Sequence, residues 1–290
     1  MAQERWLRNV VAVPPSAALC GALGAMPLLI EEDLDAQQPQ EQDFKFHYLP
    51  DAKFESFGSQ ACQPLLDKWG FGPDMVMATF RVEQQVTPDH MQAMLEAFFR
   101  DREVIGVLQQ QTRLRILSPP KVRVRWEKMS TKVTSMSFLN RFEECGAVGS
   151  SGHIRGRLEE DWEGVPIVNL IREAILMDES ELYDAFSEQD RKEFLFRIFS
   201  HLIFGGASNQ WEDHVEEYFK VTKKIYKDLL SVRRNDTGDV EVMSNVASVV
   251  SLGEGGSLFP KENPLNFCYV LVDPIMRHVK LWYFGYRPLW

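Results

Sequence analysis

Hydrophobic and polar residues follow two different periods along this chain, and the change of period separates its ends from its middle. From Phe44 onward apolar side chains recur at every second position, which predicts a β-strand. Similar short apolar or alternating runs predict strands over residues 75–82, 113–117, 121–126, 240–246, 267–272 and 278–283. The last two runs bracket Asp273-Pro274, a dipeptide typical of turns, and therefore predict a hairpin.

The middle of the chain follows helical spacing instead. This spacing predicts helices over residues 87–102, 166–175, 194–204 and 210–232. The helix at 194–204 is apolar on most sides, which predicts burial, and Gly205-Gly206 predicts its end. Ser187 and Asp190 have the spacing of a capping box, in which two side chains satisfy free backbone amides at the start of a helix.

Strands at both ends and helices between them predict an α+β fold, in which an antiparallel or mixed sheet from N- and C-terminal strands packs with a central helical block. We expect a single domain over residues 44–290 and a flexible extension over residues 1–43. Residues 10–30 carry no charged side chain and follow two arginines, as in a targeting or membrane segment. Three prolines interrupt them and favour a flexible extension, while a cleaved targeting segment stays an alternative.

Charge is distributed unevenly along the 290 residues. The chain has 32 Lys and Arg against 42 Asp and Glu, a net charge of −10 that disfavours nucleic-acid or membrane binding by the chain as a whole. Residues 113–132, however, carry seven basic residues and one acidic residue, which gives them +6 and leaves −16 elsewhere. Residues 158–217 carry sixteen acidic and four basic residues, a net charge of −12.

The basic segment is the strongest candidate for a binding site. In residues 121–126 charged and bulky side chains alternate, so a strand would place the cations on one face. The candidate partner-binding residues are Arg113, Arg115, Lys121, Arg123 and Arg125. They could dock an acidic protein surface. The structural alternative is an edge strand whose basic side chains discourage sheet-to-sheet aggregation.

Catalytic and metal-binding motifs are weak. The six histidines and four cysteines lack the spacings of metal sites. Cys145 and His153 could form a nucleophile–base pair only by meeting in space, and the Gly-rich residues 253–257 lack the lysine of a phosphate-binding loop. We therefore expect no enzymatic activity, cofactor or metal, and an enzyme or nucleotide-dependent switch with an unrecognised site stays an alternative.

Uncommon strings occur in a fixed order along the chain. Those of the helical block are Phe186-Ser187, Asp190-Arg191, Glu193-Phe194-Leu195-Phe196, His201-Leu202, Gly205-Gly206-Ala207 and residues 225–233. The others are Phe46-His47-Tyr48-Leu49-Pro50, Ala97-Phe98-Phe99, Met136-Ser137-Phe138, Ser151-Gly152-His153-Ile154 and residues 272–278. With these strings, residues 44–286 resemble the cilia- and flagella-associated protein 300 family. The likeness ends before residue 44, and residues 145–150 diverge.

The resemblance implies a non-enzymatic factor of the cytoplasm and the cilium or flagellum (axoneme). Such a factor assembles outer and inner dynein arms and delivers them in connection with intraflagellar transport. The implied partners are axonemal dynein subunits, dynein assembly factors or the intraflagellar transport machinery, with no nucleic acid and no membrane. No catalytic or ligand residue carries over, and polar members of the strings are hypothetical contacts: Arg191, Lys227, Asp228, Arg233 and Arg277. A stable axonemal structural protein that binds tubulin tails stays an alternative.

Overall fold

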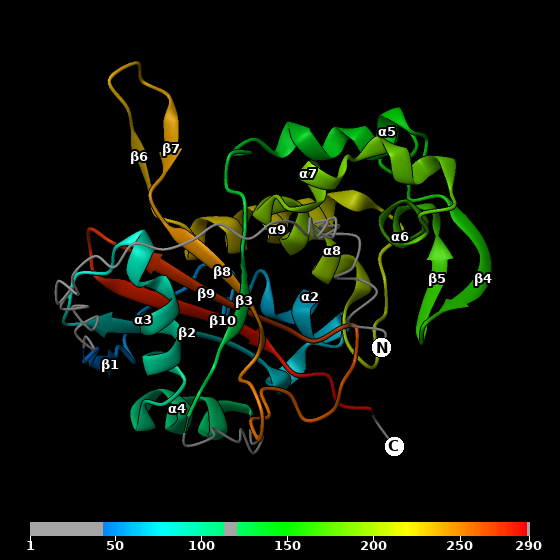
Figure 1. The fold of residues 1–290 in the computed structure, drawn as a ribbon. Helices are drawn as coiled ribbons and strands as arrows, with labels where there is room; N and C mark the ends of the chain where they lie inside the picture. Colours follow the sequence, from blue (N-terminus) through cyan, green and yellow to red (C-terminus); the bar gives the residue numbers. More distant parts are fainter. Residues whose placement is uncertain (1–42, 113–120, 289–290) are drawn as a thin grey trace, which may run out of the picture.

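A six-stranded antiparallel sheet is the centre of the computed structural model, which describes residues 43–112 and 121–288 (Figure 1). Its strand order is β1-β2-β10-β9-β8-β3, so strands from both ends of the chain lie side by side. The strands are β1 (Phe46–Tyr48), β2 (Met75–Val82), β3 (Arg125–Lys128), β8 (Asn245–Ser251), β9 (Phe267–Asp273) and β10 (His278–Phe284). Two hairpins stand apart from the sheet: β4 (Gly156–Trp162) with β5 (Val165–Asn169), and β6 (Val232–Arg234) with β7 (Val240–Val242).

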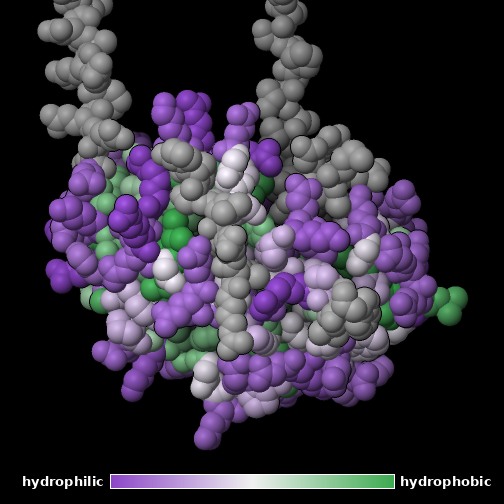
Figure 2. Space-filling model, turned by 90° about the horizontal axis from the view of Figure 1, so that it is seen from below, coloured by the Kyte–Doolittle hydropathy of each residue, from purple (hydrophilic) through white to green (hydrophobic). Residues whose placement is uncertain are grey.

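Helices cover both faces of this sheet. On one face lie α3 (Met91–Phe98) and α4 (Arg102–Thr112), and on the other lies a helical block (Figure 1). The block contains α5 (Arg141–Glu144), α6 (Leu170–Leu176), α7 (Glu188–Arg191), α8 (Phe194–Phe204) and α9 (Val215–Leu229). The short α2 (Gln63–Lys68) precedes β2. Single 3₁₀ turns are η1 (Gly72–Asp74), η2 (Pro88–His90), η3 (Met136–Asn140) and η4 (Glu181–Ala185). The architecture confirms the predicted α+β class. Seen from below, the described surface is mostly hydrophilic, with smaller hydrophobic areas (Figure 2).

The alternation of side chains along the strands divides the core into two parts. In β2, Met75 and Met77 pack with the helical block, whereas Val76, Ala78 and Phe80 pack with α3 and α4. Successive residues of a strand point to opposite faces, so a strand buried on both sides must be apolar throughout. This explains why six consecutive residues of β2 are buried and why the strand is recognisable as a continuous apolar run.

Helix α8 is the centre of the helical block. All eleven of its residues are buried, as the sequence predicts. The helix ends at Gly205, whose φ of 63° is in the left-handed region that glycine adopts at low cost. Gly206 then donates a hydrogen bond from its amide to the carbonyl of Trp69, at 2.8 Å, and so joins the end of α8 to the chain after α2.

Two predicted helices begin or end elsewhere. The helix predicted over 87–102 ends at Phe98, and Asp101 starts α4 by accepting from the amides of Glu103 and Val104 at 2.8 and 3.1 Å. The helix predicted over 166–175 is wrong at its start, because residues up to Asn169 form β5 and the Asn169 side chain caps α6. A side-chain oxygen that accepts from the first helical amides fixes such a boundary.

The last predicted helix, 210–232, is too long at both ends, because α9 covers Val215–Leu229. Trp211 therefore precedes the helix and is 45% exposed. Near the start of α9, Lys220 forms an ion pair with Glu217. The predicted strand 240–246 is two strands, β7 and the start of β8. The predicted strand 113–117 lies outside the described residues, as do residues 1–42 of the extension predicted over 1–43.

A buried histidine gives the stability of this fold a pH dependence. His201 lies 2.8 Å from the Tyr269 hydroxyl, and burial, assisted by the charge of Arg197, holds its pKa well below the ordinary value. Below about pH 6.5 the His201 side chain therefore binds a proton in the unfolded chain but stays neutral in the folded chain. The free energy of unfolding is consequently highest above that pH and falls below it.

We expect the free energy of unfolding to fall below about pH 6.5 with a contribution from His201 of up to about 1.4 kcal/mol per pH unit. His201→Gln should lack this contribution. Denaturant titrations of both proteins between pH 5 and pH 8 measure the difference. Equal slopes for the two proteins would show that His201 does not titrate differently on folding.

Candidate functional site

Three of the five candidate basic residues lie at one edge of the central sheet. Strand β3 is the last strand of the sheet among residues 43–112 and 121–288, where it pairs with β8 alone. Just before it and at its start, Lys121, Arg123 and Arg125 are exposed, whereas the intervening Val122 and Val124 are 4% and 5% exposed. The predicted alternation of exposed cations and buried apolar groups is therefore confirmed for these residues, which we call the basic edge, but the strand predicted over 121–126 begins only at Arg125 and ends at Lys128. Arg113 and Arg115 lie outside the described residues.

The backbone of the basic edge is held on both sides. The Arg123 amide donates to the Leu252 carbonyl at 3.1 Å, which extends the pairing of β3 toward its N-terminal side. On the other side, the side-chain amide nitrogen of Gln92 in α3 donates to the Val124 carbonyl at 3.0 Å, and its side-chain oxygen accepts from the Trp126 indole at 2.7 Å. Arg123 and Arg125 thus project from a hydrogen-bonded backbone, which lowers the entropy that a partner must remove on binding.

The charges of the basic edge are available to a partner. Within the described ranges, Lys121, Arg123 and Arg125 form no ion pair. Lys128 of β3 is exposed as well. The position also agrees with the structural alternative, because basic side chains on an edge strand oppose pairing with another sheet. One arrangement can serve both roles.

The helical block presents the opposite charge. We call residues 158–217 the acidic layer, and ten of its sixteen acidic residues are exposed: Glu159, Glu160, Asp161, Asp178, Glu179, Glu181, Asp184, Glu188, Asp213 and Glu216. Of its four cations, Arg172, Arg191 and Arg197 are buried. The fully exposed charges of the acidic layer are therefore all negative. An acidic surface of this kind can steer a basic partner.

Two of the buried arginines close the ends of helices. Arg172 donates to the carbonyls of Ile203 and Phe204 at the end of α8, and burial lowers its pKa to about 10. Arg191 donates to the carbonyls of Ala174 and Ile175 at the end of α6. The last carbonyls of a helix have no partner within it, so a guanidinium with five donors satisfies them well.

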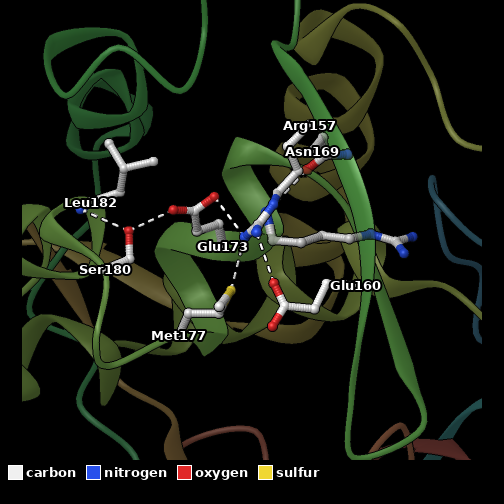
Figure 3. Close-up of polar contacts among 8 residues, drawn as sticks. Arg157, Glu160, Asn169, Glu173, Met177, Ser180 and Leu182 are labelled. Atoms are coloured by element: carbon white, nitrogen blue, oxygen red, sulfur yellow. Dashed lines mark hydrogen bonds and ion pairs between the residues drawn. The ribbon is translucent and has the colours of Figure 1, made fainter.

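Part of the acidic layer is fixed by a polar network around Arg157 (Figure 3). The Arg157 guanidinium binds Glu173 of α6 at 2.8 Å and Glu160 of its own strand at 2.8 Å. Ser180 donates to the second oxygen of Glu173 at 2.7 Å and accepts from the Leu182 amide. The network therefore joins β4, α6 and the start of η4, and it orients β4, a mostly exposed strand.

Some hypothetical contacts are structural. Arg191 is 6% exposed, so the hypothesis that it meets a partner is wrong. Asp228 accepts from the backbone amides of Glu55 and Ser56 at 2.8 and 2.7 Å and so anchors the loop before α2. Arg233 binds Glu241 across a hairpin, and Arg277 donates to the Glu83 carbonyl. Lys227 is exposed and remains available.

The structure also places the weak catalytic candidates. The Cys145 thiol lies 3.6 Å from the Phe142 carbonyl, and the His153 ring packs against His214 with ring centres 5.5 Å apart. The glycines at 253 and 255 have positive φ and belong to the connection from β8 to β9. In the described part of the chain, no group of three or more His, Cys, Asp or Glu residues could hold a metal. Nor is any helix there long and apolar enough to span a bilayer.

The sequence did not predict a groove that the structure shows at the surface of the helical block. Its volume is about 550 Å³, and it lies between α9, the hairpin β6–β7 and the residues before η3. Lys223 and Lys227 line it together with apolar side chains. The spacing of lysines at 220, 223, 224 and 227 is the signal that could have indicated a basic face on this helix.

The fold and its surfaces define a class: an α+β protein that presents a basic edge and an acidic layer from a rigid core. Comparison with known sequences supplies the family. The family described as cilia- and flagella-associated protein 300 matches residues 43–284, so the chain belongs to this family and has a cilium- and flagellum-associated role.

Relatives with the same description agree with this assignment. The cilia- and flagella-associated protein 300 of Chlamydomonas reinhardtii is 33% identical over 234 residues, which are 78% of this chain and 91% of the relative. That of Paramecium tetraurelia is 27% identical over 218 residues, which are 75% of this chain and 84% of the relative. No solved structure matches the chain.

Proposed function

We propose that this protein is a non-enzymatic factor that acts by protein–protein binding in the assembly of outer and inner dynein arms. In this role it works in the cytoplasm and the axoneme and accompanies the arms in connection with intraflagellar transport. Its partners are axonemal dynein subunits, assembly factors or the transport machinery. The observation that carries the proposal is the basic edge, in which exposed cations without ion pairs among the described residues project from the start of β3 and the chain just before it.

Opposite charges on separate surfaces suit a protein that holds more than one partner. The basic edge belongs to the sheet, whereas the acidic layer belongs to the hairpin β4–β5 and to the helical block on one face of that sheet. Complementary charge raises association rates and selects the orientation of a partner more than it raises affinity. A factor that collects subunits and later releases them benefits from such contacts, because they form fast and are reversible.

Reversing two charges of the basic edge tests the proposal. We expect Arg123→Glu with Arg125→Glu to reduce co-precipitation of axonemal dynein components by about tenfold or more, since each contact between a charge pair contributes roughly 1 kcal/mol and each reversal adds repulsion. The melting temperature should stay the same, because both side chains are exposed and form no ion pair within the described residues.

A matched control reverses two cations outside the basic edge, with Lys45→Glu and Arg100→Glu, both at exposed positions. We expect this variant to retain dynein components at the level of the unmodified protein. Equal recovery with the Arg123 and Arg125 reversals would remove the basic edge from the proposed function.

A further inference from the structure

The groove beside α9 combines an apolar floor with a basic rim. Its floor includes Leu195, Tyr226 and Leu230, which are 2%, 8% and 4% exposed. Lys223 and Lys227 line it from α9, and both are exposed. Tyr226 is held in place by a hydrogen bond from its hydroxyl to the Val133 carbonyl at 2.9 Å. The floor is therefore preformed.

The hairpin β6–β7 extends this apolar surface outward from the body of the protein (Figure 1). Val232 pairs with Val242 and Arg234 with Val240, so the three valines share one face of the hairpin. The opposite face carries Arg233 and Glu241, which bind each other at 2.9 Å.

Two of these valines are also part of the groove wall. Val232 and Val240 are 54% and 45% exposed and line the groove. A β-branched side chain half in water on a projecting hairpin is one that a partner can cover with a gain in free energy.

The positive charge along α9 indicates that the occupant of the groove carries negative charge. Lys220, Lys223, Lys224 and Lys227 recur at the spacing of one helix face, and Lys220 alone of the four binds an acidic residue of the described chain, Glu217. Within the described residues the groove lining contains no Asp or Glu. An occupant with carboxylates beside its apolar side chains would therefore complement the groove.

The shape of the floor selects the form of the occupant. Lys223, Tyr226, Lys227 and Leu230 lie at spacings of three and four along α9, so the groove follows the helix for about two turns, or roughly 10 Å. A second helix packs into the grooves between such side-chain rows. We propose that the groove of α9 and β6–β7 is a docking site for an acidic amphipathic helix of a partner protein, with its apolar face on the floor and its carboxylates on Lys223 and Lys227.

This site is distinct from the basic edge and adds a second mode of binding to the proposed function, on which it does not depend. The basic edge offers charge on a strand, whereas the groove offers an apolar pocket with charge at its rim. A partner could occupy both, and two linked contacts hold more tightly than either alone.

The test uses the full chain and a fluorescein-labelled helical peptide of 18 residues, with leucines on one face and glutamates beside them. A peptide of the same composition with scattered leucines is the control. We expect fluorescence anisotropy to detect micromolar binding of the amphipathic peptide and at least about tenfold weaker binding of the control, because only the former presents a continuous apolar face.

Variants locate the binding. Two double variants of the groove, Lys223→Glu with Lys227→Glu and Val232→Ser with Val240→Ser, should each weaken the binding of the amphipathic peptide by about tenfold or more. A double variant of the basic edge, Lys121→Glu with Arg123→Glu, should change the affinity for this peptide by less than about twofold. All six side chains are at the surface, and circular dichroism checks that each variant keeps its fold. The proposal would be overturned if the amphipathic and scattered peptides bound with equal affinity. It would also be overturned if the basic-edge variant lost as much peptide affinity as the groove variants.

Two other occupants are outcomes of the same experiment. Residues 28–35 of this chain are also apolar and acidic, so neutralising Glu31, Glu32, Asp33 and Asp35 to the amides should leave peptide affinity unchanged. A severalfold gain would mean that the chain fills its own groove. Binding to vesicles of 30% phosphatidylserine that depends on Val232 and Lys227, without peptide binding, would identify a membrane surface and contradict the proposal.

Discussion

Replacing Arg191 by alanine is expected to lower the free energy of unfolding by about 3 kcal/mol or more, since it leaves several buried acceptors without a donor. The guanidinium donates to the carbonyls of Phe186, Ile175, Ala174 and Tyr183, at 3.1, 3.0, 3.0 and 2.6 Å. It also lies over the Tyr183 ring. One side chain thus joins α6, η4 and α7, and burial lowers its pKa.

Two further substitutions separate charge from geometry at this position. Arg191→Lys keeps a cation but cannot reach four carbonyls with one ammonium, so we expect it to recover less than half of the loss. Gln189→Ala, at an exposed position of the same helix, should change stability by less than about 0.5 kcal/mol. Guanidinium chloride titrations measure all three, and a loss at Arg191→Ala no larger than at Gln189→Ala would contradict the role assigned to the guanidinium.

Replacing Gly206 by alanine is the second change with a large expected effect. A Cβ at this position would meet the backbone of Gly70, with the carbonyl carbon 2.7 Å away, and backbone cannot move aside as a flexible side chain can. Gly205 and Gly206 therefore allow the end of α8 to lie directly against the chain after α2. We expect a loss of about 3 kcal/mol, the upper range for forcing a methyl group into a packed interior.

A glycine in open space provides the control for this prediction. Gly106 lies within α4, and a Cβ there would have no atom within 4 Å beyond its own helix and neighbours. Gly106→Ala should therefore raise stability by about 0.5–1 kcal/mol, because alanine loses less backbone entropy in a helix. Thermal unfolding of both variants tests the contrast. A Gly206→Ala protein as stable as the original would show that α8 and the 69–70 turn are not in close contact.

Helix α8 and strand β2 were predictable because an element that is buried on all sides consists of a nearly continuous run of apolar residues. Eight of the eleven residues of α8 are apolar, and a capping box upstream and two glycines downstream favour a buried helix between them. The capping box itself is present, with Ser187 and Asp190 each bonded to the backbone of the other. In such segments local preference and tertiary packing favour the same structure.

The start of α6 was not predictable from periodicity. Ile167, Leu170, Ile171, Ala174 and Ile175 fit one helix face, yet Val165 and Ile167 are the buried side of β5. Alternation over five residues and helical spacing over ten overlap in this stretch, so the hairpin with β4 decides between them. The break between α3 and α4 has a similar cause, because the Asp101 cap interrupts a stretch whose apolar pattern is continuous.

The candidate site was predictable in part. Alternation located the exposed cations of the basic edge, since a strand separates polar from apolar side chains whatever its partners are. Its place at the end of the sheet follows from long-range pairing with β8, which local sequence does not encode. The groove beside α9 needed the fold as well, because Val232 and Leu195 are far apart in the chain.

Lysine-directed crosslinking of the complex isolated from ciliated cells tests the central claim most directly, because mass spectrometry then names both the partner and the contact residue. The account predicts crosslinks from Lys121 and Lys128, which flank Arg123 and Arg125, to axonemal dynein subunits or their assembly factors. The Arg123 and Arg125 reversals should remove these crosslinks. Crosslinks from the same two lysines to tubulin alone, unchanged by the reversals, would contradict the account.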